Sequence, residues 1–238
     1  MPATFLNMLF ILLGSGLGLL FQNLISGRLL SILTHALGLC VLSIGVSGAI
    51  GTENMLCVIV CMVVGTVAGN AIDIERHLEG AGDFLRSKIG GKGNSRFTEG
   101  FVNAALLFCV GAMAITGSIE AGLNGNYEII LSKGIIDGVT SISFAATMGV
   151  GVMFSVIPLL IYQGGITLLA GWVGPYLPGA VITEMSAVGG ALIIAIAFNM
   201  LGLGREKIKV GNMLPAVFLP IVYFPLASWL GNVCACFR

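Results

Sequence analysis

The charged residues of this chain are concentrated in one block, and the rest of the sequence is nearly free of charge. Residues 73–99 carry 10 of the 22 Asp, Glu, Lys and Arg side chains among 238 residues. On both sides of this block lie apolar runs of about 20 residues, the length that an α-helix needs to cross the hydrocarbon core of a bilayer. Lipid offers no partners to backbone N–H and C=O groups, so such runs must satisfy them internally as helices.

The composition agrees with a membrane protein. Hydrophobic residues make up 57% of the chain and charged residues 9%, whereas about a quarter of the residues of a soluble domain are charged. The mean hydropathy is +1.03, and the runs lack the alternation of barrel strands. We predict an all-α fold, a polytopic transmembrane helical bundle of seven or eight spans in contact with the lipid bilayer. The predicted spans cover residues 5–21, 29–48, 55–71, 101–118, 131–148, 150–169, 178–203 and 214–233.

Several ligand classes find no support in the sequence. The formal net charge is zero and the basic residues are spread over several loops, so we expect no nucleic-acid partner. Four of the six cysteines lie inside apolar spans, where they serve as packing residues, and Cys234 and Cys236 are too isolated to indicate a metal site. We therefore expect no metal and no cofactor.

The basic residues predict the orientation of the chain in the membrane. The two strongest basic clusters lie in residues 73–99 and 205–209, and four predicted spans between them place both on one side. Short loops rich in Lys and Arg stay in the cytoplasm. We expect a multi-pass protein of the bacterial inner membrane with loop 73–99 cytoplasmic and both termini outside. The first half of this loop has the spacing of an amphipathic helix, which ends where four residues break the pattern, namely Gly90, Gly91, Gly93 and Asn94.

The number of spans before the loop predicts an internal repeat. Three spans precede it and at least three follow, and an odd number of spans inverts the second copy relative to the first. We expect residues 1–72 and 100–171 to be inverted three-helix repeats, joined by an amphipathic linker over 73–99 and followed by two further spans in 172–238. Interrupted helices are expected where Pro158 and the sequence Gln163-Gly164-Gly165 occur.

Four segments of this chain resemble a bacterial membrane family known as domain of unknown function 554. They are residues 101–117, residues 133–138, the triplet Tyr162-Gln163-Gly164 and residues 212–215. The resemblance extends over nearly the whole chain. It implies a multi-span inner-membrane protein with transport as the expected activity, and it supplies no catalytic or binding residues.

Two acidic residues inside predicted spans are the leading candidates for a functional site. Asp137 and Glu184 both lie about six residues inside a span, and a carboxylate at the bilayer centre costs at least about 2.5 kcal/mol, so it faces a cavity or a partner. Both spans enter from the outer face, which predicts a shared depth and a common site. The other predicted site residues supply neutral polar groups, and they are Thr34, Asn103, Thr140, Ser141, Gln163 and Ser186.

Structural roles are the alternatives for the same residues. Lys133 precedes Asp137 by four residues, so a helical ion pair could neutralise the carboxylate without any function. Glu184 could instead stabilise the positive end of a helix dipole. Asn103 and Gln163 could be hydrogen-bonding residues between helices.

The leading functional hypothesis is a secondary transporter of a small solute or ion, with its site near the membrane midplane between the inverted repeats. A small channel is one alternative, and it needs a continuous polar lining. A non-transporting membrane subunit or sensor that docks through the cytoplasmic loop is the other. We expect no enzyme activity, because the sequence contains no catalytic triad order, metal cluster or phosphate loop. A homodimer is expected because so small a bundle has little interior for a site.

Overall fold

The structure, a computed structural model, describes residues 1–22, 26–89 and 95–236, and it contains only helices and connecting turns in these ranges. The break predicted at residues 90–94 lies outside the described residues. The first elements are α1 (Pro2–Gln22), α2 (Gly27–Ala49), α3 (Met55–Ile72), α4 (Ile74–Ile89), α5 (Ser95–Cys109), α6 (Ala112–Leu123) and α7 (Glu128–Met148). Short segments follow as α8 (Gly151–Phe154), α9 (Val156–Leu159), the π-helix η1 (Leu160–Gly164), α10 (Gly165–Leu168), α11 (Ala170–Val173) and the 3-10 helix η2 (Gly174–Tyr176). The last elements are α12 (Gly179–Leu201), the 3-10 helix η3 (Val210–Phe218) and α13 (Pro220–Cys236).

The predicted all-α membrane fold is confirmed. Six helical stretches in the described residues are long and apolar enough to cross a membrane, and the number rises to eight if each of two bent helix pairs forms one span. Two predicted spans are not straight, because the predicted span 214–233 falls on η3 and α13, which are bent by 42°, and residues 101–118 divide into α5 and α6, which are bent by 58°. The bend occurs at Gly111, whose φ of +157° a residue with a side chain rarely adopts.

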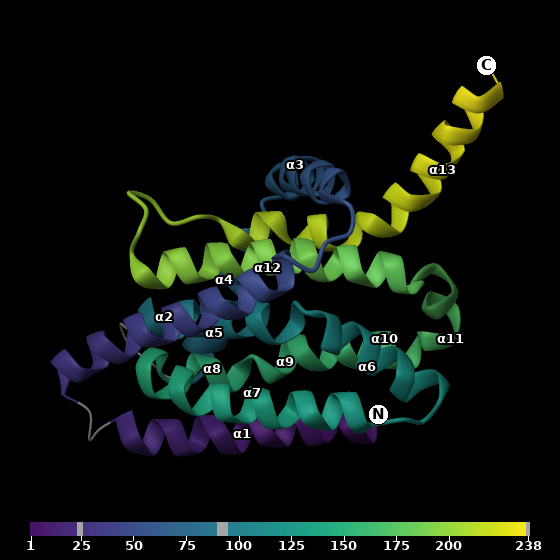
Figure 1. Cartoon of the computed structure of the whole chain (residues 1–238). Helices are drawn as coiled ribbons and strands as arrows, with labels where there is room; N and C mark the ends of the chain where they lie inside the picture. Colours follow the sequence, from purple (N-terminus) through teal and green to yellow (C-terminus); the bar gives the residue numbers. More distant parts are fainter. Residues whose placement is uncertain (23–25, 90–94, 237–238) are drawn as a thin grey trace.

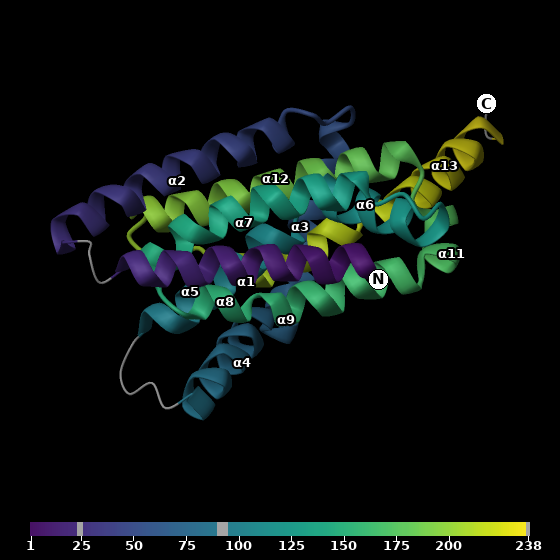
Figure 2. The same cartoon turned by 90° about the horizontal axis from the view of Figure 1, so that it is seen from below.

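Helices α1 and α7 run parallel and in contact over most of their length (Figure 2). Glycines make this contact possible. A Cβ added to Gly14 would collide with the Gly138 carbonyl and the Ser141 hydroxyl, and one added to Gly18 would collide with the Ile142 carbonyl. Such close backbone approach is how membrane helices associate when the hydrophobic effect contributes little.

The second close pair consists of α2 and α12, which run antiparallel. A Cβ on Gly190 would meet the backbone of α2 at Gly45 and Ala49. Helix α12 is the most buried of the candidate spans, with 67% of its best window inside the molecule. Helix α3 runs across the direction of α12 and is seen end-on in Figure 1, and it contacts η3 through Gly65 and Gly69.

Both basic segments of the chain lie at one end of the bundle. The Lys207 ammonium is 2.8 Å from the Glu99 carboxylate, and the N-terminus lies at the opposite end (Figure 1). The inverted repeat stays a prediction, and its first copy includes residues 23–25, which are not described. In the described residues, α1, α2 and α3 are continuous, whereas the interruptions fall after residue 100.

Candidate functional site

A buried ion pair lies on the inner face of α7. Lys133 and Asp137 are four residues apart, so one helical turn places both side chains on the same face, and the Lys133 Nζ contacts the Asp137 Oδ2. The two residues are only 6% and 7% exposed. The structure therefore forms the local pair that the spacing allows, inside a helix long enough to span a membrane.

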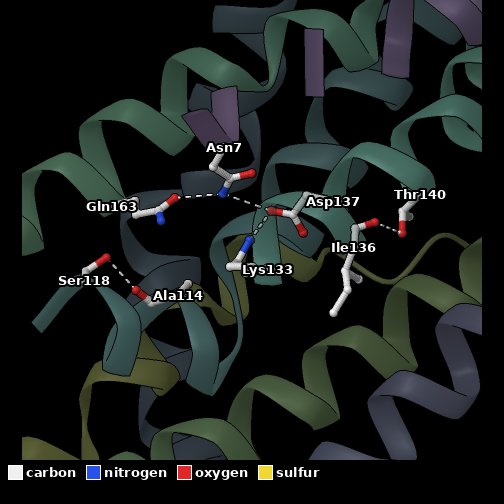
Figure 3. A network of polar contacts seen from close by, with 8 residues as sticks. All are labelled: Asn7, Ala114, Ser118, Lys133, Ile136, Asp137, Thr140 and Gln163. Carbon is white, nitrogen blue, oxygen red and sulfur yellow. Dashed lines mark hydrogen bonds and ion pairs between the residues drawn. The ribbon is translucent and has the colours of Figure 1, made fainter. Parts of the chain in front are cut away.

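Asn7 of α1 extends this pair into a network (Figure 3). Its Nδ2 donates to the Asp137 Oδ2 at 3.2 Å and to the Gln163 Oε1 at 3.0 Å. The parallel contact of α1 with α7 brings Asn7 to this position. Sequence reasoning missed Asn7. The spacing was available as a signal, because Gly14 follows Asn7 by seven residues and Gly18 follows Gly14 by four, which places all three on one helix face.

Gln163 belongs to the only π-helical turn of the described residues, η1. Its side chain is fully buried. A π-turn inserts a residue into the helical ladder and is often found at functional sites. Upstream of it, Pro158 cannot donate a backbone hydrogen bond, which weakens the ladder at the start of the interruption.

The network leaves several buried polar atoms without a partner. Among the described residues, the Asn7 Oδ1, the Gln163 Nε2 and the Thr4 Oγ1 have no hydrogen bond. Each belongs to a residue that is at most 1% exposed. An unpaired buried polar group costs about 1–3 kcal/mol, and Thr4 and Asn7 lie one turn apart on α1. The site therefore holds free donors and acceptors where a ligand could pair with them.

Both interrupted stretches border this network. The Lys133 ammonium is 6.0 Å from the centre of the Phe108 ring, which lies near the end of α5 before the bend at Gly111. On the other side of the bend, Ser118 of α6 is fully buried and donates to the Ala114 carbonyl (Figure 3). Helix α6 in turn contacts η1.

Glu184 belongs to a different cluster, so the predicted common site with Asp137 is wrong. Its Oε2 accepts from the Thr52 hydroxyl at 2.6 Å, and its Oε1 accepts from the N–H groups of Glu53 and Asn54 at 2.8 and 2.9 Å. In the described residues no hydrogen bond joins this cluster to Asp137. Similar depth in two spans does not bring residues together, because α12 packs on α2 while α7 packs on α1. Glu184 instead holds the α2–α3 connector at the positive start of α3.

The remaining predicted residues do not join Asp137 in one polar site. Thr140 donates to the Ile136 carbonyl of its own helix, and Ser141 donates to the carbonyls of Gly138 and Ile11 between α7 and α1.

Thr34, Asn103 and Ser186 lie elsewhere. Thr34 and Asn103 line cavities at the basic end of the bundle. Ser186 is half-buried on α12, with its carbonyl beside Gly48 of α2.

The larger of these cavities measures about 650 Å³ and lies between α4, α5 and the segment that follows α12. Charged side chains of both signs line it. At one edge of it, the Glu75 carboxylate accepts from the Gly211 N–H, and the Glu75 N–H donates to the Asn212 Oδ1 at 2.7 Å. Burial raises the pKa of the Glu75 carboxyl above its ordinary value, and the Gly211 hydrogen bond offsets part of the rise. A smaller cavity of about 280 Å³ adjoins it. Neither is lined by Asp137.

Comparison with known proteins finds relatives along nearly the whole chain. Residues 2–225 match a family described as "Protein of unknown function (DUF554)". The chain is 32% identical over 228 residues to "Uncharacterized membrane protein YdfK" of Bacillus subtilis, covering 93% of this chain and 95% of that protein. It is 28% identical over 230 residues to "Uncharacterized protein YqgA" of Escherichia coli, covering 94% and 96%. No solved structure matches.

Proposed function

This chain belongs to the DUF554 family of membrane proteins, and from its buried polar network we propose that it is a secondary transporter of a small solute or ion. The observation that carries the proposal is the set of Lys133, Asp137, Asn7 and Gln163, which is buried inside candidate membrane spans with polar atoms left unpaired. Charged and amide groups in that environment are costly, and they are found where a solute or ion passes.

The elements around the network support a transport cycle. Transporter sites are formed by interrupted helices near the bilayer midplane, and here the α5–α6 bend and the π-turn of η1 border the ion pair. In contrast, glycine contacts join α1 closely to α7. In the proposed cycle, α1 and α7 stay together as a rigid unit, and the interrupted stretches move against them to open the site to each side in turn.

A channel is less well supported than a transporter. A channel needs a continuous polar lining, whereas the two cavities lie at the basic end and the larger one extends along α5 no further than Asn103. The basic end is the cytoplasmic end in this proposal, by the charge rule for short loops. We retain the homodimer and the inverted repeat as proposals.

Uptake into vesicles tests the proposal. Purified protein is reconstituted, and four labelled probes are offered under inward and outward gradients: glycine, pyruvate, methanesulfonate and sodium ion. We expect saturable uptake of at least one probe by the wild type and loss of that uptake in Asp137→Asn. Thr140→Val is the matched control, because within the part of the chain that the structure describes the Thr140 hydroxyl donates to the Ile136 carbonyl of its own helix and to no other group. Uptake that Asp137→Asn leaves intact, or no uptake of any probe by folded protein, would contradict the proposal.

A further inference from the structure

Two hydrogen bonds of the network point toward the Asp137 carboxylate, and a third points from Asn7 to Gln163. The Lys133 ammonium and the Asn7 amide group both donate to the Asp137 Oδ2, and Asn7 uses the same nitrogen to donate to the Gln163 Oε1. This direction has a cause. An ionised carboxylate only accepts hydrogen bonds, so it forces Asn7 to present its nitrogen, and Gln163 must then present its oxygen.

The unpaired atoms follow from that direction. With the Asn7 Nδ2 committed, the Asn7 Oδ1 and the Gln163 Nε2 are left without partners. Turning either amide over alone does not help. The Asn7 oxygen would then face the carboxylate oxygen, or the Gln163 nitrogen would face the Asn7 nitrogen. The ionised state of Asp137, and not an arbitrary choice of amide orientation, therefore determines which two atoms are free.

Protonation of Asp137 permits the opposite direction. A neutral carboxyl group has an O–H donor, which can donate to the Asn7 Oδ1 once that amide has turned over. The Gln163 Nε2, turned in the same way, then donates to the same Asn7 oxygen. The two atoms that are unpaired in this structure become paired, and the Asn7 Nδ2 and the Gln163 Oε1 move into the positions that lack partners. The network thus has two arrangements, which the proton on Asp137 selects.

Charge balance identifies what accompanies the proton. The Lys133–Asp137 pair has no net charge while both groups are ionised, and one added proton leaves a buried site with a charge of +1. An uncompensated charge inside a membrane protein is costly. The Lys133 ammonium, released from its carboxylate, is the donor that a small monovalent anion would meet.

We infer that this site takes up one proton together with one small monovalent anion, the proton on Asp137 and the anion on Lys133, while the Asn7 and Gln163 amides turn over. The inference rests on the proposed transport function and names its substrate class and coupling ion. The proton binds the Asp137 Oδ2. The Lys133 ammonium then exchanges its hydrogen bond to that oxygen for a hydrogen bond to the anion, and both ligands leave together on the other side of the membrane. No covalent bond other than the O–H bond forms or breaks.

The groups that face Asp137 are consistent with this assignment. From α7 the facing charge is Lys133, and α5 contributes the Cys109 thiol, which interacts electrostatically with Lys133 and Asp137. Tyr162 of η1 interacts with Cys109 in turn, and α1 contributes the neutral Asn7. Thiols and phenols ordinarily titrate above pH 8, so Asp137 is the group in this set that gains a proton at lower pH.

Infrared difference spectroscopy on the purified protein tests the proton directly. Acidification from about pH 8 to about pH 4, which brackets ordinary carboxyl titration, should produce the carbonyl band of a buried protonated carboxyl group. Because Glu75 and Glu184 also carry partly or fully buried carboxyls, the spectra are recorded in a Glu75→Gln, Glu184→Gln background. In that background the band should persist in Glu128→Gln, a control carboxyl exposed at the start of α7, and disappear in Asp137→Asn. Methanesulfonate should move the midpoint of the band to higher pH, because linkage between two ligands is reciprocal. Lys133→Met should keep the band and lose the methanesulfonate effect.

Internal pH in vesicles tests the coupling. With a pH-sensitive dye inside, inward gradients of pyruvate or methanesulfonate should acidify wild-type vesicles above the protein-free level, independently of membrane potential, and glycine or sodium ion should not. Asp137-dependent uptake of glycine or sodium ion without acidification would overturn this inference and leave transport standing. No transport of any probe would overturn the proposed function, and the infrared band would still decide whether Asp137 binds a proton. A band that survives Asp137→Asn, or that anions do not shift, would contradict the inference.

Discussion

The Asn7 amide nitrogen lies 3.2 Å from the Asp137 Oδ2, across 130 residues of sequence. This hydrogen bond ties the start of α1 to the middle of α7, and it exists because the two helices are parallel and in close backbone contact. The position of the carboxylate in the molecule therefore depends on the glycines of α1 as much as on its own helix.

A methyl group at Gly14 should disturb this arrangement. A Cβ there would collide with the Gly138 carbonyl, whereas a Cβ at Gly16 on the same helix would meet no atom within 4 Å. We expect Gly14→Ala to lower the free energy of unfolding by about 1–3 kcal/mol, the usual effect of overpacking, and Gly16→Ala to leave it unchanged. Thermal unfolding in detergent measures both. Equal stability of the two variants would contradict the close α1–α7 contact.

Glu184 should act on stability. In Glu184→Ala, the Thr52 hydroxyl and the N–H groups of Glu53 and Asn54 lose their acceptor, and each unpaired donor that stays buried costs about 1–3 kcal/mol. Glu184→Gln keeps one acceptor oxygen and should be milder. The unfolding temperature should therefore be lowest in Glu184→Ala, intermediate in Glu184→Gln and highest in the wild type. Vesicle uptake per folded protein should be near the wild-type value for Glu184→Gln. Selective loss of uptake in that variant would instead assign Glu184 to the transport site.

The sequence was sufficient for the membrane fold, because apolar runs of helical length have few alternatives in lipid. It was not sufficient for the path of each span. The bend at Gly111 depends on a backbone angle that a glycine permits but does not require, and many other glycines of this chain lie in regular helix.

The candidate site shows the same limit. The Lys133–Asp137 contact was predictable because a four-residue spacing is a local relationship. The partnership of Asn7, Asp137 and Gln163 was not, since it depends on which helices become neighbours. For that reason Glu184, at a similar depth, was wrongly grouped with Asp137.

The Glu75 carboxyl should make the docking of α4 sensitive to pH. Burial raises the pKa of this carboxyl, and the Gly211 hydrogen bond lowers it in part. The nearby carboxylates of Glu79 and Asp73 raise the pKa further, whereas the Lys209 ammonium lowers it. The folded state therefore holds the proton more tightly than the unfolded state. This contribution to stability is complete below the unfolded pKa of about 4.3, and it is lost as the pH rises through the folded pKa.

Thermal unfolding of Glu75→Gln compared with wild type measures this effect. The wild-type unfolding temperature should fall over that pH range, and the fall should be smaller in Glu75→Gln. Glu128→Gln is the control, because that carboxyl is exposed at the start of α7 and is not among the groups that shift the Glu75 pKa. An identical pH dependence in Glu75→Gln and wild type would contradict the raised pKa.

Gln163→Leu separates transport from stability. The change removes the Asn7–Gln163 hydrogen bond, worth about 1 kcal/mol, and also removes the unpaired Nε2. We expect a change of at most about 1 kcal/mol in unfolding free energy and a large loss of uptake of the transported probe. Normal uptake with normal folding would show that the amide is not needed.

Stability of the ion pair itself is measured by a double-mutant cycle. Asp137→Asn and Lys133→Met each leave one buried charge without its partner, which costs about 3–5 kcal/mol. The double variant has neither charge, so it should recover most of the lost stability. Thermal unfolding of the three variants and the wild type gives the coupling between the two residues.

Uptake by the same four proteins, reconstituted in vesicles and normalised to folded protein, tests most directly whether the pair acts in transport. If Asp137 binds a transported ligand, the double variant folds normally and still fails to take up the probe that the wild type transports. If the double variant regains wild-type uptake together with its stability, the pair only neutralises itself, and the proposed transport site is wrong.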